Sequence, residues 1–584
     1  MNWEVLTMRS ATSYFKTLVR SDLRHYWPIC FGYTFIWIAL LPMVLMRDLH
    51  DMDSPRDYVV EMMGQAMFPS LIMAVIFGII AAMACYSYLM GSRSTGLLHS
   101  LPAKRSTHFL AHFTSGMTML LGGNVIVFVL VFLAQVSGMG SVKWDVTLLW
   151  LLTATLLDFV FFTLGIFCAM FTGWLLAVPV LYVGINFAAA VIQLLIGSLS
   201  GILYYGYCDV DLLPFVTWLT PIIKIGGKFK NIDYYAGSSV PNWQDDKDIM
   251  LLLLIYAAAA LVLLGVSYLL YRRRHSEAAG DSVAFRWAKP VFRYLIAVVG
   301  GLALGMGLFW TVFDGGFVHS RVGLLVCLLL MTAICYFAAE MLICKSLRVF
   351  RQGWKGLLAA CGIVVVLFAA MCLDLFGYVH YVPDAAQVKS VDVTIDAQSF
   401  AYGANCTDEE TILAAINAQK AAIEQGRGEA EEDADCNALH LTYILKDGKE
   451  VRRSYTDMHL EKGSALHEAL NVLGNMETVA RQTLLRNASD WEIKQICGGC
   501  AYSSDGQCIL TAEEARNIYQ ALERDVAANK GNWDAAKATV VDDSKYTTIE
   551  LESVNGNYIN LDQIPTYCKD TWKIINHLHF EQDW

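Results

Sequence analysis

The chain has 584 residues, of which 56% are hydrophobic and 17% charged, with a mean hydropathy of +0.43 and a net charge of −11. These values exclude an ordinary soluble globular protein, because a soluble core cannot bury nine long helices that are apolar on every side. They give no indication of nucleic-acid binding. The sequence therefore predicts a polytopic α-helical membrane protein.

The N-terminal segment is polar and mildly amphipathic, and no short apolar region with a cleavage site precedes the first apolar run. We therefore expect no cleaved signal peptide. Within residues 12–26, apolar positions are interleaved with Lys16, Arg20 and Arg24. This pattern favours an elbow helix lying in the inner-leaflet interface. An ordinary basic flank of the first span is the alternative.

Nine apolar runs follow, each close to the length of about 20 residues that a helix needs to cross the bilayer core. Lys and Arg gather before the first run and after the second, sixth and eighth runs, which places the N-terminus in the cytoplasm and the C-terminus outside the cell membrane. The expected multi-pass spans are 28–46, 69–90, 109–135, 147–171, 174–198, 249–271, 291–312, 322–343 and 356–377.

Residues 199–223 do not resemble a simple loop. They are rich in Tyr, Trp, Leu and Ile, but Gly, Asp and Pro interrupt them. The segment is too broken to span a membrane and too apolar for water, and irregular backbone at membrane depth needs cover from protein. We expect a re-entrant helical hairpin on the outer side.

The composition changes at residue 379. Residues 379–584 hold about 34 acidic and 18 basic residues, so this part is near −16, whereas the preceding part is near +5. Alternating runs predict strands between amphipathic helices, and hence an extracytoplasmic α+β domain. Two helices begin with a capping-box pattern, Thr407 to Glu410 and Thr511 to Glu514, and a tight-turn dipeptide follows each. A duplicated unit is one interpretation, and two unrelated pieces are the other.

Six cysteines lie in this domain, and an even number in an exported domain favours structural disulfides of undetermined connectivity. Free thiols are one alternative. Redox or metal chemistry at the CGGC stretch, residues 497–500, is another, although zinc would need a second such pair. The candidate disulfide residues are Cys406, Cys436, Cys497, Cys500, Cys508 and Cys568.

Asp158 lies in the middle of the fourth apolar run. A carboxyl group inside a membrane is costly and usually faces a cavity or a partner. Asp158 is therefore a candidate pathway residue, with a contact to another subunit and a neutral hydrogen-bonded core group as alternatives. Glu340 lies near the end of the eighth run, where we expect it to pair with Lys345 or Arg348.

The chain has no phosphate-binding loop of the type G-x-x-x-x-G-K-[ST], no H-E-x-x-H and no G-x-S-x-G. These motifs carry ATP binding, zinc hydrolysis and serine hydrolysis. We accordingly expect no enzyme activity of its own, no catalytic residues, no metal and no cofactor bound by this chain.

Two stretches carry a family resemblance. The first is YLMGSRSTGLLHSLPAKRSTHFLAHFTSG at 88–116, and the second is YRRRHSEAAGDSVAFRWAKPVFR at 271–293, with Glu277 and Gly280. Together with six leading spans, they resemble the permease subunit of ABC-2 (exporter-type) ABC transporters, in the Firmicutes Ytr-like group. The resemblance is good over 1–293, weaker over 294–378 and low beyond. The three additional spans and the large C-terminal domain depart from the basic family pattern.

The resemblance implies a dimer of cytoplasmic ABC ATPase subunits that hold ATP and magnesium, and a second permease copy or paralogue in the lipid bilayer. It also implies a coupling helix at about 95–105. Leucine side chains of this helix would enter the ATPase groove and its polar side chains would contact the rim. The implied coupling residues are Leu97, Leu98, His99, Leu101, Lys104 and Arg105.

The resulting division is an ABC-2-type transmembrane domain (1–275), three additional helices (276–378) and the extracytoplasmic domain (379–584). We expect a permease that moves or extracts an amphipathic envelope substrate, such as a lipid, peptide or antibiotic, including antimicrobial peptides. The alternative is a sensor or regulatory membrane protein that relays ligand binding without transport. A third reading, an enzyme using CGGC, has little support.

Overall fold

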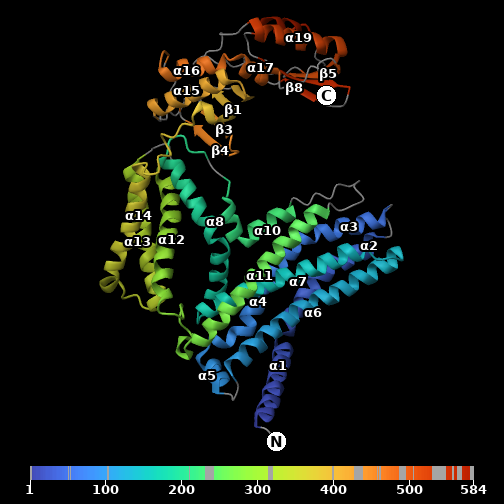
Figure 1. Cartoon of the computed structure of the whole chain (residues 1–584), viewed down its shortest axis with the longest axis vertical. Coiled ribbons are helices and arrows are strands. Elements are labelled where there is room, and N and C mark those ends of the chain that lie inside the picture. The colour runs from blue at the N-terminus through green and yellow to red at the C-terminus, as the bar shows by residue number, and fades with distance from the viewer. Residues whose placement is uncertain are drawn as a thin grey trace. The chain divides into compact units, whose positions relative to one another are not determined.

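The computed structural model of the chain is shown in Figure 1. It forms two compact units, one made of residues 1–195, 211–305 and 328–363, and the other of 196–210, 306–327 and 364–584. The residues that the structure describes are 3–49, 52, 54–100, 104–208, 211–230, 243–313, 320–397, 400–426, 438–456, 458, 462–485, 495–503, 506–528, 547–554, 558–561, 564 and 568–578.

Nine helical segments among the described residues are long and apolar enough to cross a membrane, which confirms the number predicted. Each overlaps one predicted span, and the helical turns extend beyond most of the apolar runs. The segments are Tyr14–Asp48, Pro55–Leu89, Arg105–Met139, Trp144–Phe171, Ala177–Leu203, Asp248–Arg273, Ala288–Val312, Arg321–Cys344 and Gly353–Cys372.

The first unit is built mainly on helix pairs. Helix α7 (Trp144–Phe171) contacts both α4 (Met67–Tyr86) and α11 (Trp243–Arg273), while α1 (Trp3–Leu40) contacts α6 (Arg105–Met139). The rings of Trp37 and Trp150 are fully buried and meet edge to face, with their centres 5.1 Å apart. At Gly78 of α4, a Cβ atom would lie 2.9 Å from backbone atoms of α7. Small residues let membrane helices approach this closely.

The N-terminal helix differs from the expected elbow. Residues 3–40 form one helix, α1, which passes through Pro28 without an interruption between an interfacial part and a spanning part. Short helices α2 (Pro42–Asp48) and α3 (Pro55–Gln65) follow. The side of α1 that carries Asp22 is buried against α6, and the interfacial position of residues 12–26 stays a prediction.

The expected re-entrant segment is divided between three elements. Helix α8 (Ala177–Leu203) includes its first five residues, so the predicted boundary at 199 was wrong. Two short helices follow, α9 (Pro214–Leu219) and α10 (Pro221–Lys230), and α10 contacts α4. The depth of these helices in a membrane stays a prediction.

Helices α12 (Ala288–Val312), α13 (Arg321–Cys344) and α14 (Phe350–Cys372) share a small core of Ala297, Tyr336 and Ala360. The carboxylate of Glu340 forms an ion pair with Arg293 of α12. The predicted partners of Glu340, Lys345 and Arg348, were therefore wrong. Lys345 instead pairs with Asp281 at 3.1 Å.

The C-terminal domain contains two four-stranded antiparallel sheets with the orders β2-β1-β3-β4 and β6-β5-β7-β8. In each sheet a hairpin, a helix and a second hairpin follow one another, and the register shifts near the start of the first strand. The strands are β1 (Val388–Ala397), β2 (Phe400–Cys406), β3 (Ala438–Leu445), β4 (Glu450–Tyr455), β5 (Ile496–Ser503), β6 (Gly506–Thr511), β7 (Thr547–Ser553) and β8 (Tyr558–Leu561).

The intervening helices are α15 (Glu409–Gln425) and α19 (Ala512–Ala528), close to the amphipathic helices that the sequence predicts over 408–425 and 512–529. Helices α16 (Ala465–Gly474), α17 (Glu477–Leu485) and α20 (Lys569–Ile575) complete the domain, and apolar residues of both sheets join one core. The capping box of α19 forms as predicted, since Thr511 and Glu514 exchange hydrogen bonds. The N-cap of α15 is Asp408, one residue after the predicted Thr407.

Candidate functional site

The two sequence stretches that carry the family resemblance meet in the structure. The first continues from α4 through the short helix η1 (Ser87–Leu89) into α5 (Ser92–Ser100), and the second begins at the end of α11. The hydroxyl of Tyr88 donates a hydrogen bond to that of Tyr271 at 3.1 Å. Helix α5 also contacts the short helix η2 (Ser276–Ala278). We call this region the α5 junction and define it by Tyr88, Thr95, Arg105, Tyr271 and Arg274.

Arg274 connects three helices at this junction. Its guanidinium donates hydrogen bonds to the carbonyl oxygens of Ala169 at 2.8 Å, Met170 at 3.1 Å and Leu89 at 3.0 Å. The side chain is buried, and this burial lowers the pKa of Arg274 to about 10, which leaves it charged at neutral pH. Carbonyl groups in the last turn of a helix lack intrahelical partners, and Arg274 supplies donors to the end of α7.

Arg105, one of the predicted coupling residues, begins α6 and reaches the same place. Its guanidinium donates to the carbonyl oxygens of Arg272 and Arg274, both at 3.0 Å. A cation at the end of α11 is favoured by the helix dipole as well as by these bonds. Lys104, in contrast, is exposed and has extended backbone just before α6. The structure therefore gives Arg105 an internal structural role besides any contact with a partner.

The backbone between α7 and α8 is also tied to the segment after α11. The amide of Gly173 donates to Asp281 at 2.7 Å, and the amide of Gly280 donates to Gly173 at 2.8 Å. The amide of Ala284 donates to Phe171 at 2.7 Å. These three backbone bonds join segments more than 100 residues apart, so the ends of α7, α8 and α11 are connected on the side of α5.

Helix α5 is anchored by its first turn. The hydroxyl of Thr95 is buried and donates to the carbonyl oxygens of Tyr88 and Gly91, both at 2.7 Å. The predicted residues Leu97, Leu98 and His99 lie in α5, but their side chains are outside the described part of the structure. Leu101 lies outside it altogether. The helix predicted for the coupling element is therefore present from Ser92 to Ser100, with its contacts to a partner left as a prediction.

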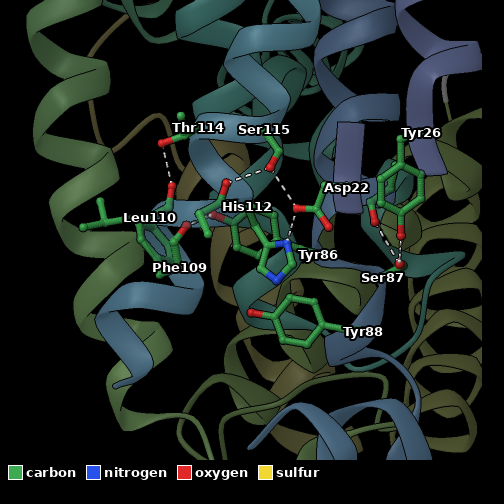
Figure 2. A network of polar contacts seen from close by, with 12 residues as sticks. Asp22, Tyr26, Tyr86, Ser87, Tyr88, Phe109, Leu110, His112, Thr114 and Ser115 are labelled. Carbon is green, nitrogen blue, oxygen red and sulfur yellow. Dashed lines mark hydrogen bonds and ion pairs between the residues drawn. The ribbon is translucent and has the colours of Figure 1, made fainter. Parts of the chain in front are cut away.

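A buried polar network lies beside the junction and links α1 to α6 (Figure 2). The carboxylate Oδ2 of Asp22 is 2.7 Å from Nδ1 of His112 and accepts a hydrogen bond from Ser115 at 2.9 Å. Asp22 is 8% and His112 4% exposed, so the pair is enclosed by protein. The ring of Tyr88 lies 4.7 Å from that of His112. This places the network next to the residue that anchors α5.

The sequence reading missed this network. Asp22 belongs to a polar N-terminal stretch and His112 follows a basic loop, so both positions are typical of solvated residues. One signal could have indicated them: residues 108, 112 and 115 lie at helical spacing on one side of α6, which is the spacing of a buried face.

Asp158 lies in a second buried network. Its Oδ2 accepts hydrogen bonds from the hydroxyl of Tyr33 at 3.0 Å and from the amide of Asn124 at 2.8 Å, and Tyr33 also donates to Asn124 at 2.7 Å. The side chain is 1% exposed. These contacts agree with the alternative in which Asp158 is a hydrogen-bonded core group. Its role as a pathway residue stays a prediction.

The expected disulfides do not form among the described cysteines, which include Cys406, Cys497, Cys500, Cys508 and Cys568. Cys436 lies outside the described residues. Cys497 and Cys500 are on the same extended strand, β5, and three residues of strand span about 10 Å, beyond the reach of a disulfide. The structure therefore does not support the predicted disulfides among the described cysteines, while redox chemistry at CGGC stays a prediction.

The described residues contain no group of three or more metal-ligating side chains close enough to hold an ion. The buried carboxyl groups of Asp22 and Asp158 instead accept hydrogen bonds from neighbouring helices. The arrangement at the α5 junction is suited to passing a mechanical displacement between helices, because the side chains and backbone bonds there connect four helix ends. Comparison with protein-family profiles finds no match, and comparison with curated proteins finds none either.

Proposed function

We propose that this chain is the permease subunit of an ABC-2-type ABC transporter. It moves or extracts an amphipathic envelope substrate, powered by ATP hydrolysis in separate cytoplasmic ATPase subunits. In this proposal the N-terminus and α5 lie in the cytoplasm, and residues 379–584 lie outside the cell membrane. The nine span-like helices found among the described residues support a multi-pass membrane protein.

The observation that carries the proposal is the way α5 is attached. Thr95 fixes the first turn of α5 to η1, and Arg274 fixes η1 to α7 and to the end of α11. A partner that displaces α5 therefore moves three helices rather than one flexible loop. This stiffness is what an element driven by a separate ATPase requires, because a two-state helix arrangement must be biased from outside the membrane.

The charge of the C-terminal domain bears on the substrate. Its net charge near −16 favours cationic amphipathic ligands over anionic ones, because the field of the domain raises the local concentration of cations. Cationic antimicrobial peptides belong to this class.

The test is co-purification of ATPase subunits from native membranes with Leu97→Asp and Leu98→Asp variants. A carboxylate on the apolar contact would weaken binding, and we expect the ATPase to be lost. The matched control is Leu347→Asp, since Leu347 is 76% exposed in the short connection between α13 and α14, on the same side by topology. An intact and active complex with both α5 variants would refute the assignment of this helix.

One measurement distinguishes a permease from the alternative, a sensor that binds its ligand without transport. Purified complex reconstituted in liposomes would show ATP-dependent movement of a labelled cationic peptide if the chain is a permease. A sensor would bind the peptide without moving it. A second permease copy or paralogue would appear in the same preparation as a second membrane subunit.

A further inference from the structure

The end of α8 forms part of the same compact unit as the C-terminal domain, and it joins the first sheet there. Gly206 makes an isolated antiparallel bridge with Ser454 of β4, whose amide donates to the Gly206 carbonyl at 3.3 Å. Gly206 has φ of +81°, and a Cβ atom at this position would lie 2.5 Å from the ring of Tyr455. Only glycine fits both constraints without strain.

Aromatic contacts reinforce this bridge. The ring of Tyr204, at the end of α8, is stacked with that of Tyr378 at 5.6 Å, and the guanidinium of Arg453 lies 4.1 Å from the centre of the Tyr378 ring. The ring of Tyr205 meets that of Tyr455 at 5.2 Å. We call this set the α8 joint and define it by Tyr204, Tyr205, Gly206, Tyr378, Arg453 and Tyr455.

Arg453 holds the joint together. It is 5% exposed and donates to the carbonyl oxygens of Tyr378 at 3.2 Å and Arg452 at 3.0 Å. A cation over an aromatic ring is attracted more strongly when water is excluded. Its neighbour Arg452 pairs with Glu450 on an exposed part of β4. The two arginines therefore differ in burial while sharing strand, charge and size.

Tyr378 is itself fixed to the end of α14. The carboxylate of Asp374 accepts hydrogen bonds from the amides of Tyr378 at 2.7 Å and Val379 at 3.0 Å. The ring that contacts Arg453 and Tyr204 is thus part of a rigid turn. The α8 joint connects the end of one span, the end of another and an edge strand of the first sheet.

The opposite end of α8 belongs to the first unit and is fixed as well. The amide of Ala177 donates to Trp174 at 3.0 Å, and Gly173 exchanges backbone bonds with Gly280 and Asp281, which follow η2, the short helix that contacts α5. Helix α8 is continuous from Ala177 to Leu203, about 40 Å at 1.5 Å per residue. Gly173, just before α8, and Gly206, just after it, are therefore each hydrogen-bonded to a segment distant in the sequence.

We propose that α8 relays the state of the C-terminal domain to the α5 junction, and that Arg453 is the positioning residue that ties the domain to this helix. A displacement of the first sheet pulls on Gly206 and Tyr204, and a continuous helix transmits it to Gly173. This inference rests on the proposed function for the meaning of the α5 junction, as the place where the ATPase acts, but its test requires no ATPase.

The test is hydrogen–deuterium exchange on the full-length protein in lipid nanodiscs, comparing the unmodified chain with Arg453→Ala and Arg452→Ala. For Arg453→Ala we expect exchange to rise roughly tenfold at residues 200–208 and 376–382, since the opening free energy of the joint falls. The relay also predicts that hydrogen–deuterium exchange changes at residues 171–176 and 278–284. Arg452→Ala should leave all four segments unchanged.

If Arg453 had a purely local role, exchange would change only at residues 200–208 and 376–382, and this result would overturn the relay. No change at the joint, or equal changes with Arg452→Ala, would overturn it too. Protection of Val391 to Ile395 in β1 reports whether the domain remains folded. If Arg453→Ala unfolds it, the pair Tyr204→Leu and Tyr204→Phe replaces it, because phenylalanine retains the stack on Tyr378 and only leucine should reproduce the four-segment pattern.

The outcomes separate the two proposals. If exchange rises at all four segments but no ATPase co-purifies with the unmodified chain, the relay stands and the transporter assignment is removed. If an ATPase co-purifies with the unmodified chain but exchange does not change at 171–176 and 278–284, the transporter assignment stands and the relay is removed.

Discussion

Arg274 donates a hydrogen bond to the carbonyl oxygen of Leu89 at 3.0 Å, across 185 positions of sequence. This bond joins the two stretches on which the resemblance to ABC-2 permeases rests. They are adjacent in space because a buried arginine needs several acceptors, and the free carbonyl groups at helix ends supply them. The basic residues of such loops are commonly counted only for topology, but here one of them organises the junction.

Replacing Arg274 with alanine should destabilise the bundle. The change removes three hydrogen bonds from a charged donor and leaves buried carbonyl groups without partners, at a cost of about 3 kcal/mol or more. Thermal unfolding in detergent measures the effect. Arg273→Ala is the matched control, because Arg273 is exposed and should cost little. Equal melting temperatures for the two variants would contradict the role given to Arg274.

Asp22 and His112 should be energetically coupled. A double-mutant cycle with Asp22→Ala and His112→Ala should give a coupling of about 1.5–3 kcal/mol, as expected for a charge-assisted bond in a buried site. Chemical unfolding of the four proteins supplies the values. Additive effects within about 0.5 kcal/mol would show that the two side chains do not interact.

Gly78→Ala should destabilise the contact between α4 and α7. Its Cβ atom would meet backbone atoms of Phe161 and Phe162 at 2.9 Å, and backbone cannot rotate away, so we expect a loss of about 1–3 kcal/mol. Gly122→Ala on α6 is the control, since no atom lies within 4 Å of its Cβ position and alanine favours helix. Unfolding curves that rank Gly78→Ala as stable as Gly122→Ala would contradict this packing.

The cysteines of the C-terminal domain should react as free thiols of very different accessibility. Burial raises the pKa of Cys406 to about 12 and also raises that of Cys568. Both thiols therefore stay protonated at pH 8 and react slowly with alkylating reagents. Cys497 is exposed and should be alkylated first. Mass spectrometry after labelling, without reductant, checks this order. A cysteine that remains unlabelled even in denaturant would indicate a disulfide.

The capping box of α19 should make stability depend on pH. Hydrogen bonds from Thr511 lower the pKa of Glu514 from its usual 4.5. A lowered folded-state pKa contributes stability above the unfolded value, and the contribution is lost as the pH falls through the folded value. The difference in melting temperature between the unmodified chain and Glu514→Gln should therefore shrink below about pH 4.5. A difference independent of pH between 3 and 7 would exclude this contribution.

Local patterns predicted the helices and much of the C-terminal domain well. The nine apolar runs appear as helices because each satisfies its own backbone hydrogen bonds, which needs no distant partner. The ends of α15 and α19 were predicted to within a residue or two from capping signals and periodicity. Even there, the choice of Asp408 over Thr407 as the N-cap depended on which side chain the folded backbone placed within reach of Thr411.

The disulfides were predicted from residue types alone, and the structure does not support them among the described cysteines. Residues 12–26 have the composition of an interfacial helix, and the structure shows them within one long helix, α1, in which Asp22 contacts His112. The CGGC spacing permits a disulfide in a turn but not along an extended strand.

The sequence by itself determined that this is a multi-pass helical protein with a charged α+β domain, because hydropathy and periodicity are local properties of the chain. Only the tertiary structure decided which charged residues are buried and what they contact. Arg274, Asp22 and Arg453 resemble solvated residues in sequence, and each becomes an internal connector once distant segments surround it. The cost of burying a charge depends entirely on the partners that the fold brings to it.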